Sequence, residues 1–165
     1  MATEQEKKVA RASKSLTWHE FVAMAGGAVL ALSLFLPWYH GDNNRATVGD
    51  SPVPRGGGDF TGFETHDLSR WLLIGAAAAP FILAYIVIRG HKLSWARGEM
   101  TAVTSIAAFG LIAYSGIIDK PGEPKGLISI KYGWVLAMIG VIAMLVGSAL
   151  RASEVERARK PPGVL

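Results

Sequence analysis

The sequence predicts an all-α integral membrane protein: a four-helix bundle with both termini in the cytoplasm and a larger first extracytoplasmic loop. Three observations lead to this prediction. Four apolar segments each have about the 20 residues that a helix needs to cross a bilayer. None of them holds a charged side chain, because the charges are confined to tails and loops. Lys and Arg are concentrated on one side of these segments. Since a hydrocarbon interior excludes unpaired backbone amides, the segments are expected to be helices that pack together.

The four helices define one membrane domain between two tails. We expect a cytoplasmic tail over 1–19, a four-helix domain over 20–151 and a second cytoplasmic tail over 152–165. The expected helices span about 20–39, 71–89, 98–118 and 131–151, and the outer loop spans 40–70.

The first helix is expected to remain in the protein and to end at an aromatic pair. The residues after its apolar core offer no small-x-small cleavage site, so it is interpreted as a signal anchor. Pro37 stops helix propagation, and Trp38 and Tyr39 are typical of the outer headgroup region.

The outer loops are expected to differ in order along their length. Residues 49–58 are too rich in Gly and Pro for a regular element, whereas 127–131 alternate weakly and predict a short extended segment. Thr65 or Asp67 is a candidate cap for the second helix. Phe60 and Phe63, with Glu64 beside them, are expected to fold back onto the bundle or the lipid interface and to form an outer-loop contact surface.

Charge distribution predicts the orientation. With the N-terminus inside, the outer side holds six of the 17 basic residues: Arg45, Arg55, Arg70, Lys120, Lys125 and Lys131. The remaining basic residues fall on the inner side, as expected for cytoplasmic flanks. Membrane topology therefore explains the net charge of +4 better than nucleic-acid binding does.

Small residues recur at helical spacing in two of the predicted helices. Gly133, Gly140 and Gly147 fall every seven residues with Ala137 between the first two, and Ala23, Gly27 and Ala31 fall every four. Each spacing forms a smooth stripe along one helix face, which allows close backbone approach. Packing within this chain and docking onto another membrane subunit both remain open.

No constellation in the sequence indicates catalysis, a cofactor or a metal. The chain has no cysteine, which excludes disulfides and thiol catalysis. The acidic and histidine residues of the outer loop show no recurrent ligand spacing. The predicted helices lack the ionisable groups that transporters and intramembrane enzymes carry at membrane depth. We therefore expect no enzyme activity and no cofactor.

Short motifs carry a resemblance that spans most of the chain. Leu36-Pro37-Trp38-Tyr39 ends the first helix, Gly62-Phe63-Glu64 precedes the second, and Tyr132-Gly133-Trp134 begins the fourth. In these motifs the chain resembles a loose group of small four-helix membrane proteins of actinobacterial type. Phe63 departs from the group, in which Trp is usual. The resemblance implies a bacterial plasma membrane and transfers no site residue.

Three functions are compatible with these features, of which an envelope sensor that uses the acidic outer loop has the least support. The first is a non-catalytic accessory or structural subunit of a larger plasma-membrane complex, with the bilayer and other membrane subunits, or further copies of itself, as partners. The alternative is an autonomous channel or carrier for a small uncharged or apolar solute, with Pro80 and residues 101–105 along its path.

Overall fold

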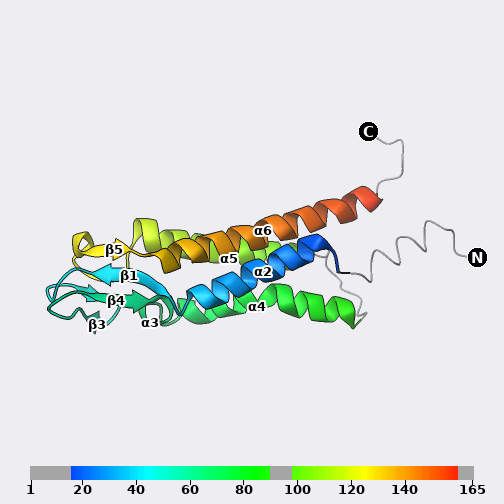
Figure 1. Ribbon diagram of the computed structural model, residues 1–165. Coiled ribbons are helices and arrows are strands. Elements are labelled where there is room, and N and C mark those ends of the chain that lie inside the picture. Colours follow the sequence, from blue (N-terminus) through cyan, green and yellow to red (C-terminus); the bar gives the residue numbers. More distant parts are fainter. Residues whose placement is uncertain (1–15, 90–97, 160–165) are drawn as a thin grey trace, which may run out of the picture.

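The computed structural model describes residues 16–89 and 98–159. It is mostly helical, with a small β cap at one end of the long helices (Figure 1). The helices are α2 (Trp18–Ser33), α3 (Gly62–Thr65), α4 (Ser69–Ile88), α5 (Glu99–Ala113), the π-helix η1 (Tyr114–Ile118), the 3₁₀ turn η2 (Lys125–Leu127) and α6 (Tyr132–Arg159). The strands are β1 (Pro37–Gly41), β2 (Thr47–Val48), β3 (Ser51–Pro52), β4 (Gly58–Thr61) and β5 (Ile128–Ile130).

Three helices of the described residues are long and apolar enough to cross a membrane. They are Ser69–Ile88, Glu99–Ile118 and Tyr132–Ser153. This composition fits the predicted membrane protein. The first helix, α2, is 16 residues long, about 24 Å at 1.5 Å per residue, which is shorter than the roughly 30 Å hydrocarbon core.

The first helix ends earlier than predicted. It was expected over 20–39, but α2 stops at Ser33 and β1 begins at Pro37. The helical conformation is disfavoured for the residue before a proline. The Ser33 carbonyl accepts the Leu36 amide at 3.0 Å and the Trp38 indole Nε1 at 2.7 Å. Trp38 and Tyr39 are fully buried. Their assignment to the exposed headgroup belt is therefore corrected, because both side chains belong to the core.

A three-stranded antiparallel sheet replaces the irregular outer loop that the all-α prediction implied. The strand order is β4-β1-β5, with His40 opposite Asp59 on one side and Ser129 on the other. The extended segment predicted at 127–131 is confirmed as β5. The sheet was missed because its strands come from distant parts of the chain, and local patterns carry no signal for that pairing.

The Gly- and Pro-rich segment also holds a regular element. Residues 49–58 were expected to be irregular, but β2 pairs with β3 in a short hairpin around Gly49, whose φ of +59° suits glycine. Val53 donates its amide to the carbonyl of Ala46 at 3.0 Å and extends this pairing.

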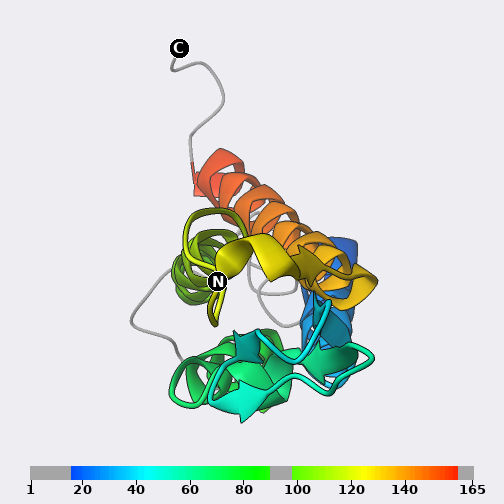
Figure 2. The same ribbon diagram turned by 90° about the vertical axis from the view of Figure 1, so that its left-hand side faces the viewer.

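The long helices lie side by side, and each packs against two neighbours. Helix α2 contacts α6 and α4, and α5 contacts the same two helices (Figure 2). The beginning of α2 and the end of α6 lie at the same end of the bundle, opposite the sheet (Figure 1). Helix α6 continues to Arg159, beyond the boundary predicted at 151. Residues 1–15, 90–97 and 160–165, which include most of the predicted tails and the inner loop, lie outside the described residues.

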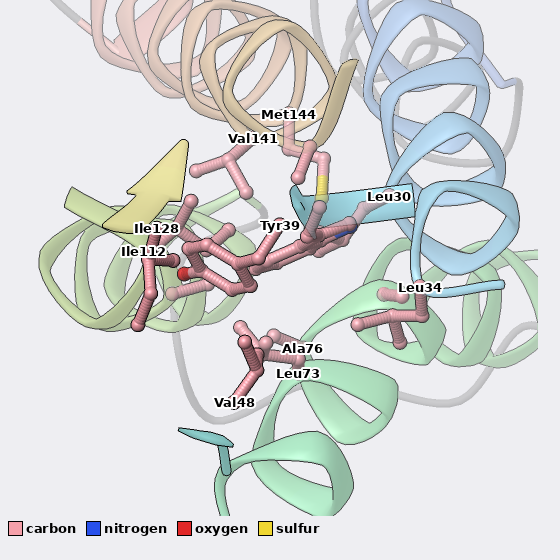
Figure 3. Close-up of a cluster of buried hydrophobic side chains, with 14 of the residues drawn as sticks. Leu30, Leu34, Tyr39, Val48, Leu73, Ala76, Ile112, Ile128, Val141 and Met144 are labelled. Carbon is pink, nitrogen blue, oxygen red and sulfur yellow. The ribbon is translucent and has the colours of Figure 1, made fainter. Parts of the chain in front are cut away.

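The core lies where the helices meet the sheet. Tyr39 of β1 projects among Ile112 of α5, Val141 of α6 and Ala76 of α4 (Figure 3). Its hydroxyl donates to the carbonyl of Ser115 at 3.1 Å, in the π-helical turn that ends the third long helix. The carbonyl of Ile112, just before this turn, accepts Trp134 Nε1 at 2.9 Å and the Ser115 hydroxyl at 3.2 Å. Tyr39 thus joins the β cap to η1, and Trp134 joins α6 to α5.

Candidate functional site

The predicted small-residue stripe of α6 lies directly against α2. A Cβ placed on Gly140 would lie 2.8 Å from the carbonyl oxygen of Gly26 and 2.8 Å from the amide nitrogen of Leu30. A Cβ on Gly147 would lie 2.6 Å from the carbonyl oxygen of His19, and one on Gly133 would lie 2.5 Å from that of Pro37. These atoms are backbone, so α6 approaches α2 at Gly140 and Gly147, and the start of β1 at Gly133, as closely as glycine allows.

The small residues of α2 divide between two neighbours. Ala23 and Gly26 face α6, whereas a Cβ on Gly27 would lie 2.6 Å from the carbonyl oxygen of Ala77 in α4. Ala31 packs against the core cluster, and Ala137 of α6 is fully buried. All the residues predicted for helix packing therefore contact parts of this chain. Gly26, which the four-residue stripe omits, makes one of the closest contacts.

Two glycines of the long helices have open space beside them, unlike the glycines described above. Gly75 of α4 and Gly110 of α5 are exposed, and a Cβ added to either would meet nothing within 4 Å. Large apolar side chains surround them on the outward faces, including Leu72 and Ile82 on α4 and Ile106 on α5.

The predicted outer-loop contact residues have separate roles. Phe60 packs against the core, whereas Phe63 stacks on Phe35 with ring centroids 5.6 Å apart. The Arg70 guanidinium lies 4.8 Å from the centre of the Phe63 ring. Glu64 caps α3, because its Oε2 accepts the backbone amide of Thr61 at 2.9 Å. Phe63 thus folds back onto the ends of α2 and α4.

The cap of α4 differs from the expectation. Leu68 is the N-cap residue, and no side chain caps this helix. The Thr65 hydroxyl instead donates to the carbonyl of Thr61 at 3.0 Å within α3. Asp67 Oδ1 lies 3.6 Å from the Arg70 guanidinium, one turn later. The short helix α3 was not predicted from the sequence. Its last residue is Thr65, which had been a candidate cap for α4.

Polar residues of the cap form an exposed cluster on the sheet. His40 Nδ1 lies 2.5 Å from Asp59 Oδ1, and Lys131 Nζ lies 3.6 Å from the same oxygen. The hydrogen bond with His40 lowers the pKa of Asp59. Within residues 16–89 and 98–159, no three His, Cys, Asp or Glu residues are grouped to hold a metal ion. Cross-strand pairing explains this cluster.

The buried ionisable groups of the cap are held in their neutral forms. Burial raises the pKa of Tyr39 to about 12, and burial lowers the pKa of His66. The His66 ring packs against both Trp38 and Tyr39, with centroid distances of 5.4 and 5.9 Å. His66 Nδ1 lies 2.8 Å from the hydroxyl of Thr65. This arrangement joins the segment before α4 to the core.

A polar junction that the sequence prediction missed lies at the opposite end of the bundle. Glu20 of α2 and Arg151 of α6 are only 7% and 5% exposed, and Arg151 Nε lies 3.5 Å from Glu20 Oε1. We expected Glu20 and Arg151 at the inner ends of the first and fourth predicted helices, where charged residues usually extend toward the headgroups. Both are interior residues, paired with each other.

Sequence signals for this junction existed. Arg151 falls four residues after Gly147 and continues its buried stripe, and Glu20 falls three residues before Ala23. Thr17 and Glu20 also have the spacing of a capping box, and Glu20 Oε2 accepts the Thr17 amide at 2.7 Å. Extending each small-residue stripe by one turn would have predicted the pair.

A small cavity lies beside the ion pair. Its volume is about 10 Å³, and Glu20, Pro80, Thr101, Ser148 and Arg151 are among its lining residues. All four long helices contribute to it. Such a volume is about the least that can hold one water molecule.

Comparison with known proteins returned no relative. No family model, no curated protein and no solved structure matches this chain.

Proposed function

We propose that the chain is a four-span protein of a bacterial plasma membrane, with both termini in the cytoplasm and the sheet outside. The apolar composition of α2 supports a fourth span, although the helix itself is short. Pairing of Glu20 with Arg151 reduces the cost of placing their charges close to the hydrocarbon. The start of α2 and the end of α6 lie together (Figure 1), as an even number of spans requires.

Within this topology we propose a non-catalytic accessory or structural subunit of a larger membrane complex. The observation that carries the proposal is the pair of outward glycines. The other glycines of the long helices and η1 lie where an added Cβ would collide, whereas Gly75 and Gly110 have open space beside them. Glycine on an outward face lets a neighbouring transmembrane backbone approach closely.

The proposed contact surface differs from the one that the sequence favoured. The stripes containing Gly27 and Gly140 are covered by helices of this chain, so the outward faces of α4 and α5 remain for a partner. The buried Ser105 and Ser148 hydroxyls have structural partners, because each donates to a carbonyl one turn earlier. These bonds favour a packing role over a chemical one.

The alternative function is a channel or carrier for a small uncharged or apolar solute. It needs a path between α4 and α5, near Pro80 and Thr101. Among the described residues, the cavity lined by Pro80 and Thr101 has a volume of about 10 Å³, which is too small for a solute larger than water. The accessory-subunit proposal is therefore favoured.

The test is co-purification from native membranes in a mild detergent. We expect the tagged chain to migrate within a large assembly, and Gly75→Leu or Gly110→Leu to reduce the yield of partners. Ile139→Leu, at another exposed apolar site on α6, is the matched control and is expected to retain them. Migration of the wild-type chain alone would contradict the proposal. Migration as a small homo-oligomer would direct attention to solute flux.

A further inference from the structure

Thr101 is an exception among the buried hydroxyl groups of the long helices. Its side chain is 1% exposed, and its Oγ1 has no hydrogen-bond partner among the described residues. Ser105, one turn later, donates to the carbonyl of Thr101 at 2.6 Å, and Ser148 donates to that of Met144 at 2.7 Å. A buried hydroxyl without a partner is costly, so each such group in a native protein calls for an explanation.

The carboxylate of Glu20 is incompletely satisfied at the same place. Its Oε2 accepts the Thr17 amide, but its Oε1 has no hydrogen-bond partner among the described residues. The contact of Oε1 with Arg151 Nε is 3.5 Å, longer than the roughly 2.7–2.9 Å of a charge-assisted hydrogen bond. Separations of this kind are commonly bridged by water.

The two unsatisfied oxygens belong to residues that line one cavity. The cavity of about 10 Å³ has both Thr101 and Glu20 in its wall, which is about the smallest space that holds a water molecule. A bound water also needs two to four polar partners, which these oxygens begin to supply. A cation is disfavoured there because Arg151 balances the charge of Glu20.

We propose that this cavity binds one ordered water molecule, hydrogen-bonded to Thr101 Oγ1 and Glu20 Oε1. The water joins α5 to the ion pair between α2 and α6. Three helices are then tied together at the end of the bundle opposite the sheet. This site is independent of the proposed partner surface, which lies on outward faces of α4 and α5.

The test exploits the near-identical shapes of threonine and valine. If water is bound, Thr101→Val removes its partner, and the midpoint of thermal unfolding in detergent should fall by roughly 2–8 °C. Thr101→Ser keeps the hydroxyl, so its unfolding midpoint should fall less than that of Thr101→Val. Thr104→Val is the matched control on the same helix, because the Thr104 hydroxyl donates to the carbonyls of Met100 and Thr101 and does not line the cavity.

A dry cavity gives the opposite result. Removing an unpaired buried hydroxyl should leave the midpoint unchanged or raise it, and either outcome for Thr101→Val would overturn the proposal. A nuclear Overhauser effect between a long-lived water and the Thr101 side chain provides the second measurement. It should be present in the wild-type chain and lost in Thr101→Val. Its absence from the wild type would overturn the proposal even if Thr101→Val were destabilised.

Discussion

Substitution of Gly140 by alanine tests the close contact between α2 and α6. The added Cβ would lie 2.8 Å from both the Gly26 carbonyl oxygen and the Leu30 amide nitrogen. Neither backbone atom can rotate away, so the helices must separate by roughly 0.5 Å, at the overpacking cost of about 1–3 kcal/mol. For a chain of this size that corresponds to a fall of about 3–10 °C in the unfolding midpoint.

The assay is thermal unfolding of the purified chain in detergent, followed by tryptophan fluorescence. Gly75→Ala is the matched control, because it makes the same chemical change where nothing lies within 4 Å. Its midpoint should stay constant or rise, since alanine favours helix more than glycine does. If Gly140→Ala unfolds at the same temperature as Gly75→Ala, the close backbone contact between α2 and α6 is refuted.

Three further predictions concern the cap. Trp38→Phe should destabilise the chain by about 1–3 kcal/mol, because the Ser33 carbonyl keeps only the Leu36 amide as donor and the core loses part of a large buried side chain; an unchanged denaturant midpoint would contradict this. Tyr39→Phe should cost about 0.5–1.5 kcal/mol through loss of the bond to Ser115, and the wild-type absorbance titration should contain one tyrosine with a pKa of about 12 that the variant lacks. Because burial lowers the pKa of His66 below its ordinary 6.5, the unfolded chain binds the proton first, so this contribution to stability is complete above pH 6.5 and is lost as the pH falls through the folded pKa. The unfolding midpoint should therefore fall less on acidification in His66→Phe than in the wild type, and equal slopes would exclude His66 as the cause.

The long helices were predictable because their signal is local. Composition and length are sufficient to locate α4, α5 with η1, and α6. The small-residue spacing also indicated the faces that contain Gly140 and Gly147, although it could not say whether α2 or another protein covers them. That information comes only from the relative placement of the helices.

The cap was not predictable for the opposite reason. Tyr39 pairs with Phe60 on one side and Ile130 on the other, and no pattern around Tyr39 indicates those partners. An aromatic pair after a proline is typical both of a membrane interface and of a buried strand. The interface interpretation extended the first helix by several residues and assigned Trp38 to the wrong environment.

The polar junction was missed because charge was treated as a sign of solvent exposure. Glu20 and Arg151 stand at the ends of apolar segments, where charged residues usually extend into the headgroup region. Their helical phase carried more information, since each continues a buried stripe. Phase therefore predicts burial better than residue type at these two positions.

Cysteine labelling of intact cells tests the proposed membrane topology most directly, because the chain has no cysteine of its own. The two positions to replace are Arg55, on the exposed surface of the β cap, and Arg89, at the exposed end of α4 away from the sheet. With a membrane-impermeant maleimide, Arg55→Cys should be labelled in intact cells and Arg89→Cys only after permeabilisation. Labelling of both without permeabilisation, or of Arg89→Cys alone, would contradict the account.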